Sequence, residues 1–201
     1  LTYPKYEDQG GVPYFHVVSD QCTKGDGTLP HFEYVPCEVQ WPFGHGLSFT
    51  AFEYSELTLS DSQIHYTAEG QRRGVSRGSE DKGITVSVMV KNAGTVDADE
   101  TVMFFTFDDS RHTTPEYKRL RAYEKIHLGA GERKLVSISL SMKDPDMRYI
   151  GPHDDTHSIV QNGMVFRVGV GAQVDCRLDP QSKHLCSGPV TVITGDDYIG
   201  A

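Results

Sequence analysis

Short runs in which apolar and polar residues alternate are the feature that most limits how this chain can fold. In residues 84–90, an aliphatic side chain occupies every second position and points to one face of a strand, while Thr85 and Ser87 point to the other. The sequence Asn92-Ala-Gly94 then supplies residues that favour a turn. We therefore expect one face of this strand to be buried and the other to be exposed to solvent.

Similar short runs recur along the chain between turn residues, and no long helical period competes with them. We expect strands over residues 49–59, 84–90, 101–107, 120–128, 135–140, 164–170 and 190–194. Residues 101–107 are apolar on both faces, so the outward face of that strand is expected to be covered by another part of the protein. The pattern predicts an all-β fold, a sandwich of about seven strands.

Residues 1–46 lack this pattern. They are rich in proline, glycine and aromatic residues and show neither a helical nor a strand period. We expect an irregular connector over residues 1–46, followed by one domain over residues 47–201. Within that domain, residues 68–83 are rich in Arg, Ser, Gly and Glu, which predicts a mobile loop.

Charge and hydropathy argue against two classes of partner. The net charge is −9, and the only clusters of basic residues are Arg72-Arg73 and residues 118–121, which is not the pattern of a nucleic-acid-binding or membrane-surface protein. No apolar run approaches the roughly 18 to 20 residues that span a bilayer, and residues 1–4 do not resemble a signal peptide. We expect no nucleic-acid or membrane partner, and a chain that begins within a longer protein or after processing.

The four cysteines form two closely spaced pairs, Cys22 with Cys37 and Cys176 with Cys186. No Cys-x-x-Cys or His-x-x-x-His pattern accompanies them, which favours disulfides over a zinc site. Of the three possible connectivities, local pairing is favoured because each pair closes a polar loop rich in Gly, Pro and Asp. Disulfides predict an extracellular protein, and the alternative is reduced, buried thiols in a cytosolic one.

No group of side chains in the sequence points to catalysis. The carboxylate pairs at 108–109, 154–155 and 196–197 are adjacent residues, which face opposite ways on a strand or lie in solvated loops. The cluster His153-Asp-Asp-Thr-His157 could bind a divalent cation, but an exposed polar loop between strands is the simpler interpretation. The sequence therefore predicts no catalytic, substrate-binding or metal-binding residue and no cofactor.

Three motifs carry a resemblance to a known family. They are Pro42-Phe-Gly-His-Gly-Leu-Ser-Phe-Thr-Ala-Phe52, Val90-Lys-Asn-Ala-Gly94 and Arg119-Leu-Arg-Ala-Tyr-Glu-Lys-Ile-His-Leu-Gly-Ala-Gly-Glu132, with Glu100 before an aromatic strand. In order and spacing they resemble the C-terminal fibronectin type III-like domain of the family 3 glycoside hydrolases, the β-glucosidase and β-xylosidase family. Ala122 and Tyr123 stand where that family has glycine and phenylalanine. Residues 1–4 resemble the end of the preceding α/β-sandwich domain.

The resemblance implies both a fold and an activity. It implies a fibronectin III or immunoglobulin-like sandwich, and it favours a strand over residues 117–126, whose spacing also fits one face of a helix. It implies a secreted, retaining glycosidase for β-linked glucosides or xylosides, whose catalytic aspartate and glutamate lie in domains before residue 1. Because no segment here matches either catalytic motif, this region alone is expected to be inactive and to meet substrate only through those domains.

Aromatic residues near the start of the sandwich are the predicted contact with those preceding domains. We assign Trp41, Phe43, His45, Phe49 and Phe52 to interdomain packing. A carbohydrate-binding module, in which aromatic rings stack on sugars, is one alternative function. A protein-interaction sandwich with no enzymatic parent is the other, and it rests on the fold alone.

Overall fold

A computed structural model describes the backbone of residues 3–4, 21–24, 33–36, 39–41, 46–66, 82–108, 118–144, 147, 149–151, 154–171, 174, 176, 185–194 and 198–200. The strands are β1 (Tyr3–Pro4), β2 (Gln21–Lys24), β3 (Glu33–Pro36), β4 (Val39–Trp41), β5 (Phe52–Leu59), β6 (Gln63–Tyr66), β7 (Ile84–Asn92), β8 (Ala98–Asp108), β9 (Lys118–Leu128), β10 (Arg133–Leu140), β11 (Tyr149–Gly151), β12 (Asp154–Gln161), β13 (Val165–Val170), β14 (Cys186–Thr194) and β15 (Tyr198–Gly200). Among these residues, no helix is long and apolar enough to cross a membrane.

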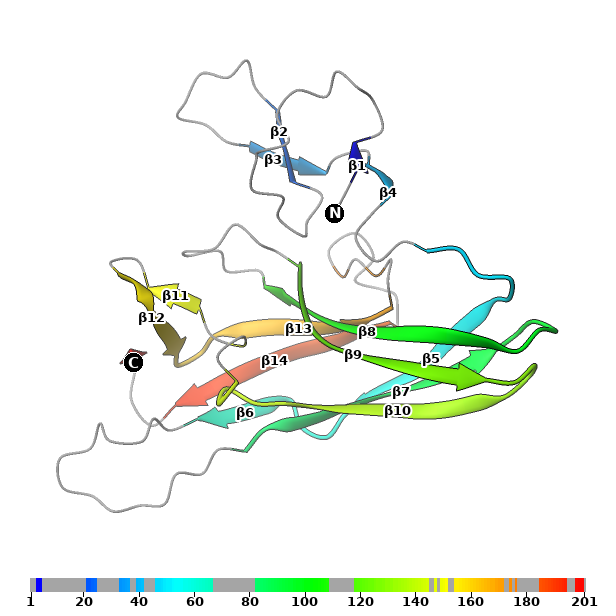
Figure 1. Ribbon diagram of the computed structural model, residues 1–201. Helices are drawn as coiled ribbons and strands as arrows, with labels where there is room; N and C mark the ends of the chain where they lie inside the picture. The colour runs from blue at the N-terminus through cyan, green and yellow to red at the C-terminus, as the bar shows by residue number, and fades with distance from the viewer. Residues whose placement is uncertain are drawn as a thin grey trace.

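Eight of the strands form two sheets that face each other (Figure 1). The three-stranded sheet has the order β10–β7–β5, and the five-stranded sheet has the order β6–β14–β13–β8–β9. Neighbouring strands are antiparallel except β6 and β14, which run parallel. The predicted all-β sandwich is confirmed.

All seven predicted strands are present, with ends shifted by a few residues. The ambiguous residues 118–126 lie in β9, so the strand interpretation is correct and the helical one is not. The short strand β6 was not predicted, and neither was the three-stranded sheet β11–β12–β15. Residues 154–157 belong to β12, so the predicted polar loop at this position is wrong.

The connector is less irregular than predicted. Within residues 1–46, β1 pairs with β4 and β2 pairs with β3, both antiparallel. These pairs are short, and the period of two is hard to detect over two to four residues. The predicted mobile loop at 68–83 falls mostly outside the described residues, of which only Lys82 and Gly83 belong to it.

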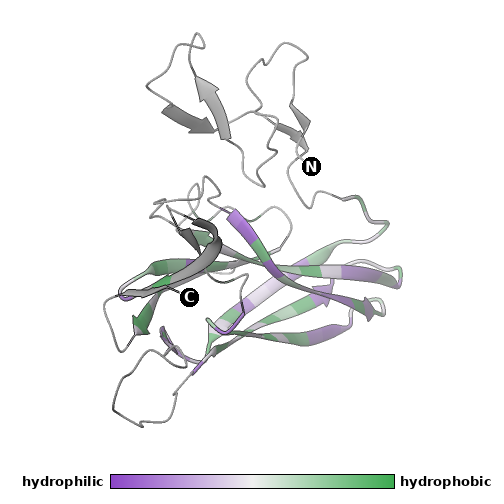
Figure 2. Cartoon of the chain, turned by 60° about the vertical axis from the view of Figure 1, so that its left-hand side comes forward, coloured by the Kyte–Doolittle hydropathy of each residue, from purple (hydrophilic) through white to green (hydrophobic). Residues whose placement is uncertain are grey.

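The main core lies between the two sheets, and it is built by the alternation seen in the sequence. The inward residues of β7 are all buried, and Val88 of this strand is directly opposite Val136 of β10. Phe104 of β8 and Val168 of β13 contribute from the five-stranded sheet. Bands of hydrophobic and hydrophilic residues alternate along the long strands (Figure 2). Solvent and core faces are therefore separated by the period of two.

A second, smaller core covers the outward face of β8. It consists of Phe105, Phe107, Val174 and Cys176, with Met103, Leu120, Leu185 and Cys186 partly buried around it. The covering residues come from the connection between β13 and β14. The prediction that the outward face of residues 101–107 is covered is therefore confirmed.

Candidate functional site

The three sequence motifs meet at one buried side chain, Asn92, at the end of β7. Its amide oxygen accepts hydrogen bonds from Thr50 Oγ1 (2.6 Å) and from the Gly94 N–H (3.1 Å). Its amide nitrogen donates to the carbonyl oxygens of Val96 (2.8 Å) and Leu128 (3.1 Å). We call these contacts the Asn92 network. Because every polar atom of this buried side chain has a partner, the network is a fixed junction rather than a reactive site.

The backbone of Asn92 extends this junction to the turn between β9 and β10. Its N–H donates to the carbonyl of Glu132 (2.9 Å), and its carbonyl accepts from the N–H of Gly131 (3.0 Å). Gly131 has a φ of 76°, which glycine adopts without steric cost. The carboxylate of Glu132 accepts a hydrogen bond from the Gly129 N–H (2.8 Å). Residues 129–132 thus form a turn that closes on Asn92.

On its other side the Asn92 network holds Thr50 and Ala51, which lead into β5. Besides the Thr50 hydroxyl, the carbonyl of Ala51 accepts a hydrogen bond from the Ala93 N–H (2.8 Å). A Cβ atom at position 94 would overlap the Thr50 hydroxyl oxygen, so the close approach of these segments requires glycine. The Asn-Ala-Gly sequence therefore ends a strand and also fixes the path of the chain before the sandwich.

A second cross-link ties the two sheets together close by. The hydroxyl of Tyr54 in β5 donates to Oε1 of Glu100 in β8 (2.6 Å). Burial, assisted by the hydrogen bond to Glu100, raises the pKa of Tyr54 well above its usual range. Glu100 thus has a structural role, because its carboxylate accepts a hydrogen bond from the opposite sheet.

Two large apolar side chains project from the segment that this network holds. Leu47 is 95% exposed and Phe49 is 98% exposed. The residues lie two apart in an otherwise polar stretch, beside a fixed junction. Phe52, another predicted packing residue, is instead half-buried and packs against the main core. Trp41 lies in β4, with its backbone alone described, and Phe43 and His45 lie outside the described residues.

Of the two predicted disulfides, Cys176–Cys186 is present, with a Cα–Cα distance of 5.7 Å. Cys22 lies in β2, and Cys37 lies outside the described residues, so the other pairing stays a prediction. Disulfide formation at Cys176 and Cys186 excludes the alternative of reduced thiols at these two positions.

Several charged side chains of the described residues pair with one another at the surface. Lys125 and His127 of β9 contact the carboxylate of Asp99 of β8 at 3.0 Å and 2.8 Å, and their hydrogen bonds lower its pKa. Lys82 Nζ lies 2.8 Å from the carboxylate of Asp61, and its hydrogen bond lowers the pKa of Asp61. Among the described residues, no group of three or more His, Cys, Asp or Glu side chains is placed to hold a metal ion.

The Asn92 network was not predicted as a unit, although the sequence carries a signal for it. Asn92 continues the inward register of Ile84, Val86, Val88 and Val90, so its amide falls on the buried face of the strand. A polar side chain at such a position must be satisfied by hydrogen bonds. The identity of its partners depends on contacts between distant segments, which the local pattern does not contain.

Known proteins resemble this chain over most of its length. A lysosomal β-glucosidase of Dictyostelium discoideum is 32% identical over 141 residues, which are 70% of this chain and 15% of that protein. A β-xylosidase of Formosa agariphila is 30% identical over 173 residues, which are 86% of this chain and 21% of that protein. The chain thus spans only a small part of the curated relatives that it matches. No protein-family model matches this sequence.

Solved structures support the same fold. A β-glucosidase of Listeria innocua superimposes with a TM-score of 0.61 at 23% identity, over 96% of this chain and 23% of that one. A β-glucosidase of Kluyveromyces marxianus gives a TM-score of 0.50 at 29% identity, over 69% of this chain and 14% of that one. The sandwich described above therefore occurs as one part of much longer polypeptides.

Proposed function

Since this chain belongs to glycoside hydrolase family 3, the family of the β-glucosidases and β-xylosidases, we propose that it is an accessory region of such an enzyme. In this proposal the complete protein hydrolyses O-glycosyl bonds of β-linked glucosides or xylosides. The present region has no catalytic group of its own and supports the catalytic domains that precede it.

The observation that carries the proposal is the combination of the Asn92 network with the exposed residues Leu47 and Phe49. Two nearly fully exposed apolar side chains cost solvation free energy unless another surface covers them. The network holds Thr50 and Ala51, which directly follow these two residues, and this limits the conformational entropy lost when they dock. We infer that these residues pack against the preceding domains of the same protein.

The chemistry of the described residues agrees with an accessory role. A retaining glycosidase needs two carboxyl groups about 5 to 5.5 Å apart, one as nucleophile and one as acid and base. Several carboxylates of the described residues contact donors within the sandwich, among them Glu100 with Tyr54, Asp99 with Lys125 and His127, and Asp61 with Lys82. These contacts support a structural role for the carboxylates that make them.

The first test is the activity of the isolated chain. The purified 201-residue chain should show no hydrolysis of an aryl β-glucoside or an aryl β-xyloside above the buffer blank. Turnover that co-elutes with the folded chain would overturn the proposal. In the same preparation, a carbohydrate-binding module would be retained on insoluble glucan and would lose retention in Trp41→Ala, and that result would replace an accessory role with sugar binding.

The second test addresses docking in the complete enzyme. Leu47→Ser/Phe49→Ser should lower its thermal midpoint and activity, because it removes the apolar contact with the catalytic domains. Leu135→Ser on the outer face of β10 is the matched control, since Leu135 is also an exposed leucine and lies on another sheet surface. Equal effects of the two variants, or no effect of the first, would argue against docking through residues 46–51.

Two finer points belong to the same proposal. The order of the two sheets supports a fibronectin III-like or immunoglobulin-like sandwich. The Cys176–Cys186 disulfide supports a secreted protein, since such bonds persist mainly in oxidising compartments. Detection of the enzyme in the culture medium of its source, with this disulfide formed, would test both the compartment and the bond.

A further inference from the structure

The outward face of β8 is buried partly by residues that belong to neither sheet, and Lys118 of β9 lies over the Phe105 ring at 4.2 Å. Phe105 and Phe107 are 0% and 1% exposed, although they lie on the opposite side of β8 from the main-core residue Phe104. Val174 and Cys176 pack over them and form the second core. Two aromatic side chains thus depend on a few covering residues for their burial.

One covalent bond and three backbone hydrogen bonds anchor these covering residues. Cys176 is linked to Cys186, the first residue of β14. The Val170 N–H donates to the Leu185 carbonyl (2.9 Å), the Gly171 N–H to the Met103 carbonyl (2.9 Å), and the Val174 N–H to the Gly171 carbonyl (3.3 Å). The disulfide is the strongest of these links, and it is the only one of them that a reductant can break.

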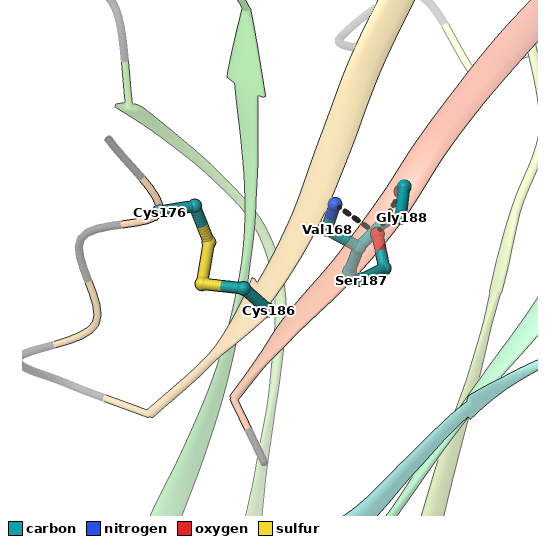
Figure 3. The surroundings of a disulfide bond; sticks show 5 residues. All are labelled: Val168, Cys176, Cys186, Ser187 and Gly188. Atoms are coloured by element: carbon teal, nitrogen blue, oxygen red, sulfur yellow. Dashed lines mark hydrogen bonds between the residues drawn. A yellow bond between two sulfur atoms is a disulfide. The ribbon is translucent and has the colours of Figure 1, made fainter. Parts of the chain in front are cut away.

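The strands beneath are shaped to receive the disulfide. A Cβ atom at Gly169 of β13 would lie 2.6 Å from Phe107 Cε2 and 2.8 Å from Cys176 Sγ, so a side chain here would occupy the position of the bond. The register in which β13 pairs with β14 shifts between Arg167 and Gly169 of β13. At this irregularity the Ser187 hydroxyl accepts a hydrogen bond from the Val168 N–H (2.9 Å), beside the disulfide (Figure 3).

We propose that the Cys176–Cys186 disulfide is a redox-sensitive clasp that keeps the second core closed. A dithiol reductant attacks the half-buried Cys186 Sγ and breaks the S–S bond. The protein gains two electrons and two protons as two thiols, and the reductant closes to its own disulfide. Val174 and Cys176 then separate from β8 and expose Phe105 and Phe107, while the main core between the sheets stays folded. This inference is independent of the proposed function.

The main core survives in this proposal because the disulfide lies outside it, among the residues of the second core. The disulfide joins Cys176, in the connection between β13 and β14, to Cys186, the first residue of β14, so it does not link the two sheets. Main-core residues such as Val88 and Phe104 contact strands of the facing sheets and do not contact the disulfide. Loss of the clasp should therefore open one face of one sheet, which is local unfolding.

The test reduces the folded 201-residue chain and alkylates it with iodoacetamide. Cys22→Ala/Cys37→Ala is the working variant, because Cys176 and Cys186 are then the only cysteines. Binding of the apolar dye ANS should rise several-fold after reduction. Hydrogen-exchange protection of the Val170 and Gly171 amides should fall by about tenfold or more. Amides of β7 should keep their protection, which reports the main core.

A second variant guards against a failure of refolding. Cys176→Ala/Cys186→Ala should bind ANS without reductant, and reductant should not increase the binding further. Unchanged dye binding and exchange in the reduced working variant would overturn the proposal, because packing alone would then hold the cover. Loss of protection in β7 together with β13 would overturn it as well, because the opening would then be global.

Discussion

The two faces of β8 are equally buried, but they are buried by different means. On the inward face, Phe104 belongs to the main core, most of whose residues come from alternating positions of strands in both sheets. On the outward face, Phe105 and Phe107 form a cluster with Val174 and Cys176, which belong to a connection held by a disulfide, and Lys118 of β9 lies over the Phe105 ring at 4.2 Å. Burial of the first kind is distributed over many strands, whereas burial of the second kind depends on one local closure.

Substitution of each phenylalanine by alanine measures the difference directly. Phe104→Ala should cost about 3–5 kcal/mol of unfolding free energy, because the facing sheets cannot close on the cavity. Phe105→Ala should cost about 2–3 kcal/mol, since the covering residues can settle into the vacated space. Urea denaturation of both variants measures these values. Equal costs would show that the cover is as rigid as a sheet.

The polar end of the main core offers a second contrast. Asn92→Ala should cost about 3 kcal/mol, because the buried carbonyls of Val96 and Leu128 lose their donor. Thr50→Val should cost only about 1 kcal/mol, since it removes one hydrogen bond at a half-buried site. Urea midpoints of the two variants test this order. If the Thr50 variant were as unstable as the Asn92 variant, the bond from Thr50 would matter as much to stability as the bonds that Asn92 donates to Val96 and Leu128.

Adding a methyl group at Gly169 should strain the second core and leave the main core unchanged. Gly169→Ala should cost about 1–3 kcal/mol, because the added methyl group meets Phe107 and Cys176. The cost should shrink in reduced, alkylated protein, in which Cys176 is free to move. Gly188→Ala is the control, because a Cβ atom there meets no atom within 4 Å. Thermal denaturation under both redox conditions tests the prediction, which fails if the cost is unchanged by reduction.

The smallest effect concerns the hydrogen bond between the sheets and its dependence on pH. Tyr54→Phe should cost about 1 kcal/mol at neutral pH, where it loses the bond to Glu100. Because the pKa of Tyr54 is raised in the folded state, its contribution is complete below the unfolded value of about 10 and is lost as the pH rises above that value. Between pH 9 and 11.5, the wild type should therefore lose more stability than the variant. Parallel pH profiles would contradict this assignment.

The regular part of the fold could be predicted from the sequence, because it follows from local alternation. Residues 84–90 and 135–140 gave strands that pair in the structure, with Val88 opposite Val136. The coverage of residues 101–107 followed from their apolar character on both faces. The identity of the cover did not, because Val174 and Cys176 are single apolar residues among polar neighbours, and only long-range contact gives them a role.

The candidate site shows the same limit. Phe49 was predicted as a docking residue, and the structure exposes it, but Phe52 three positions later packs into the main core. Both are aromatic residues of one motif, and the change from irregular backbone to β5 between them decides which way each points. The strand β6 was missed because only Ile64 and Tyr66 carry its pattern, and two residues do not establish a period.

The parallel pairing of β6 with β14 has a consequence for how the protein is made. Ile64 and Val192 are paired neighbours, although more than half of the chain lies between them. Such a contact raises the contact order, and its formation must wait until the last long strand has left the ribosome. During synthesis the edge of β6 therefore stays unpaired, and this is the interval in which a nascent chain is most exposed to aggregation.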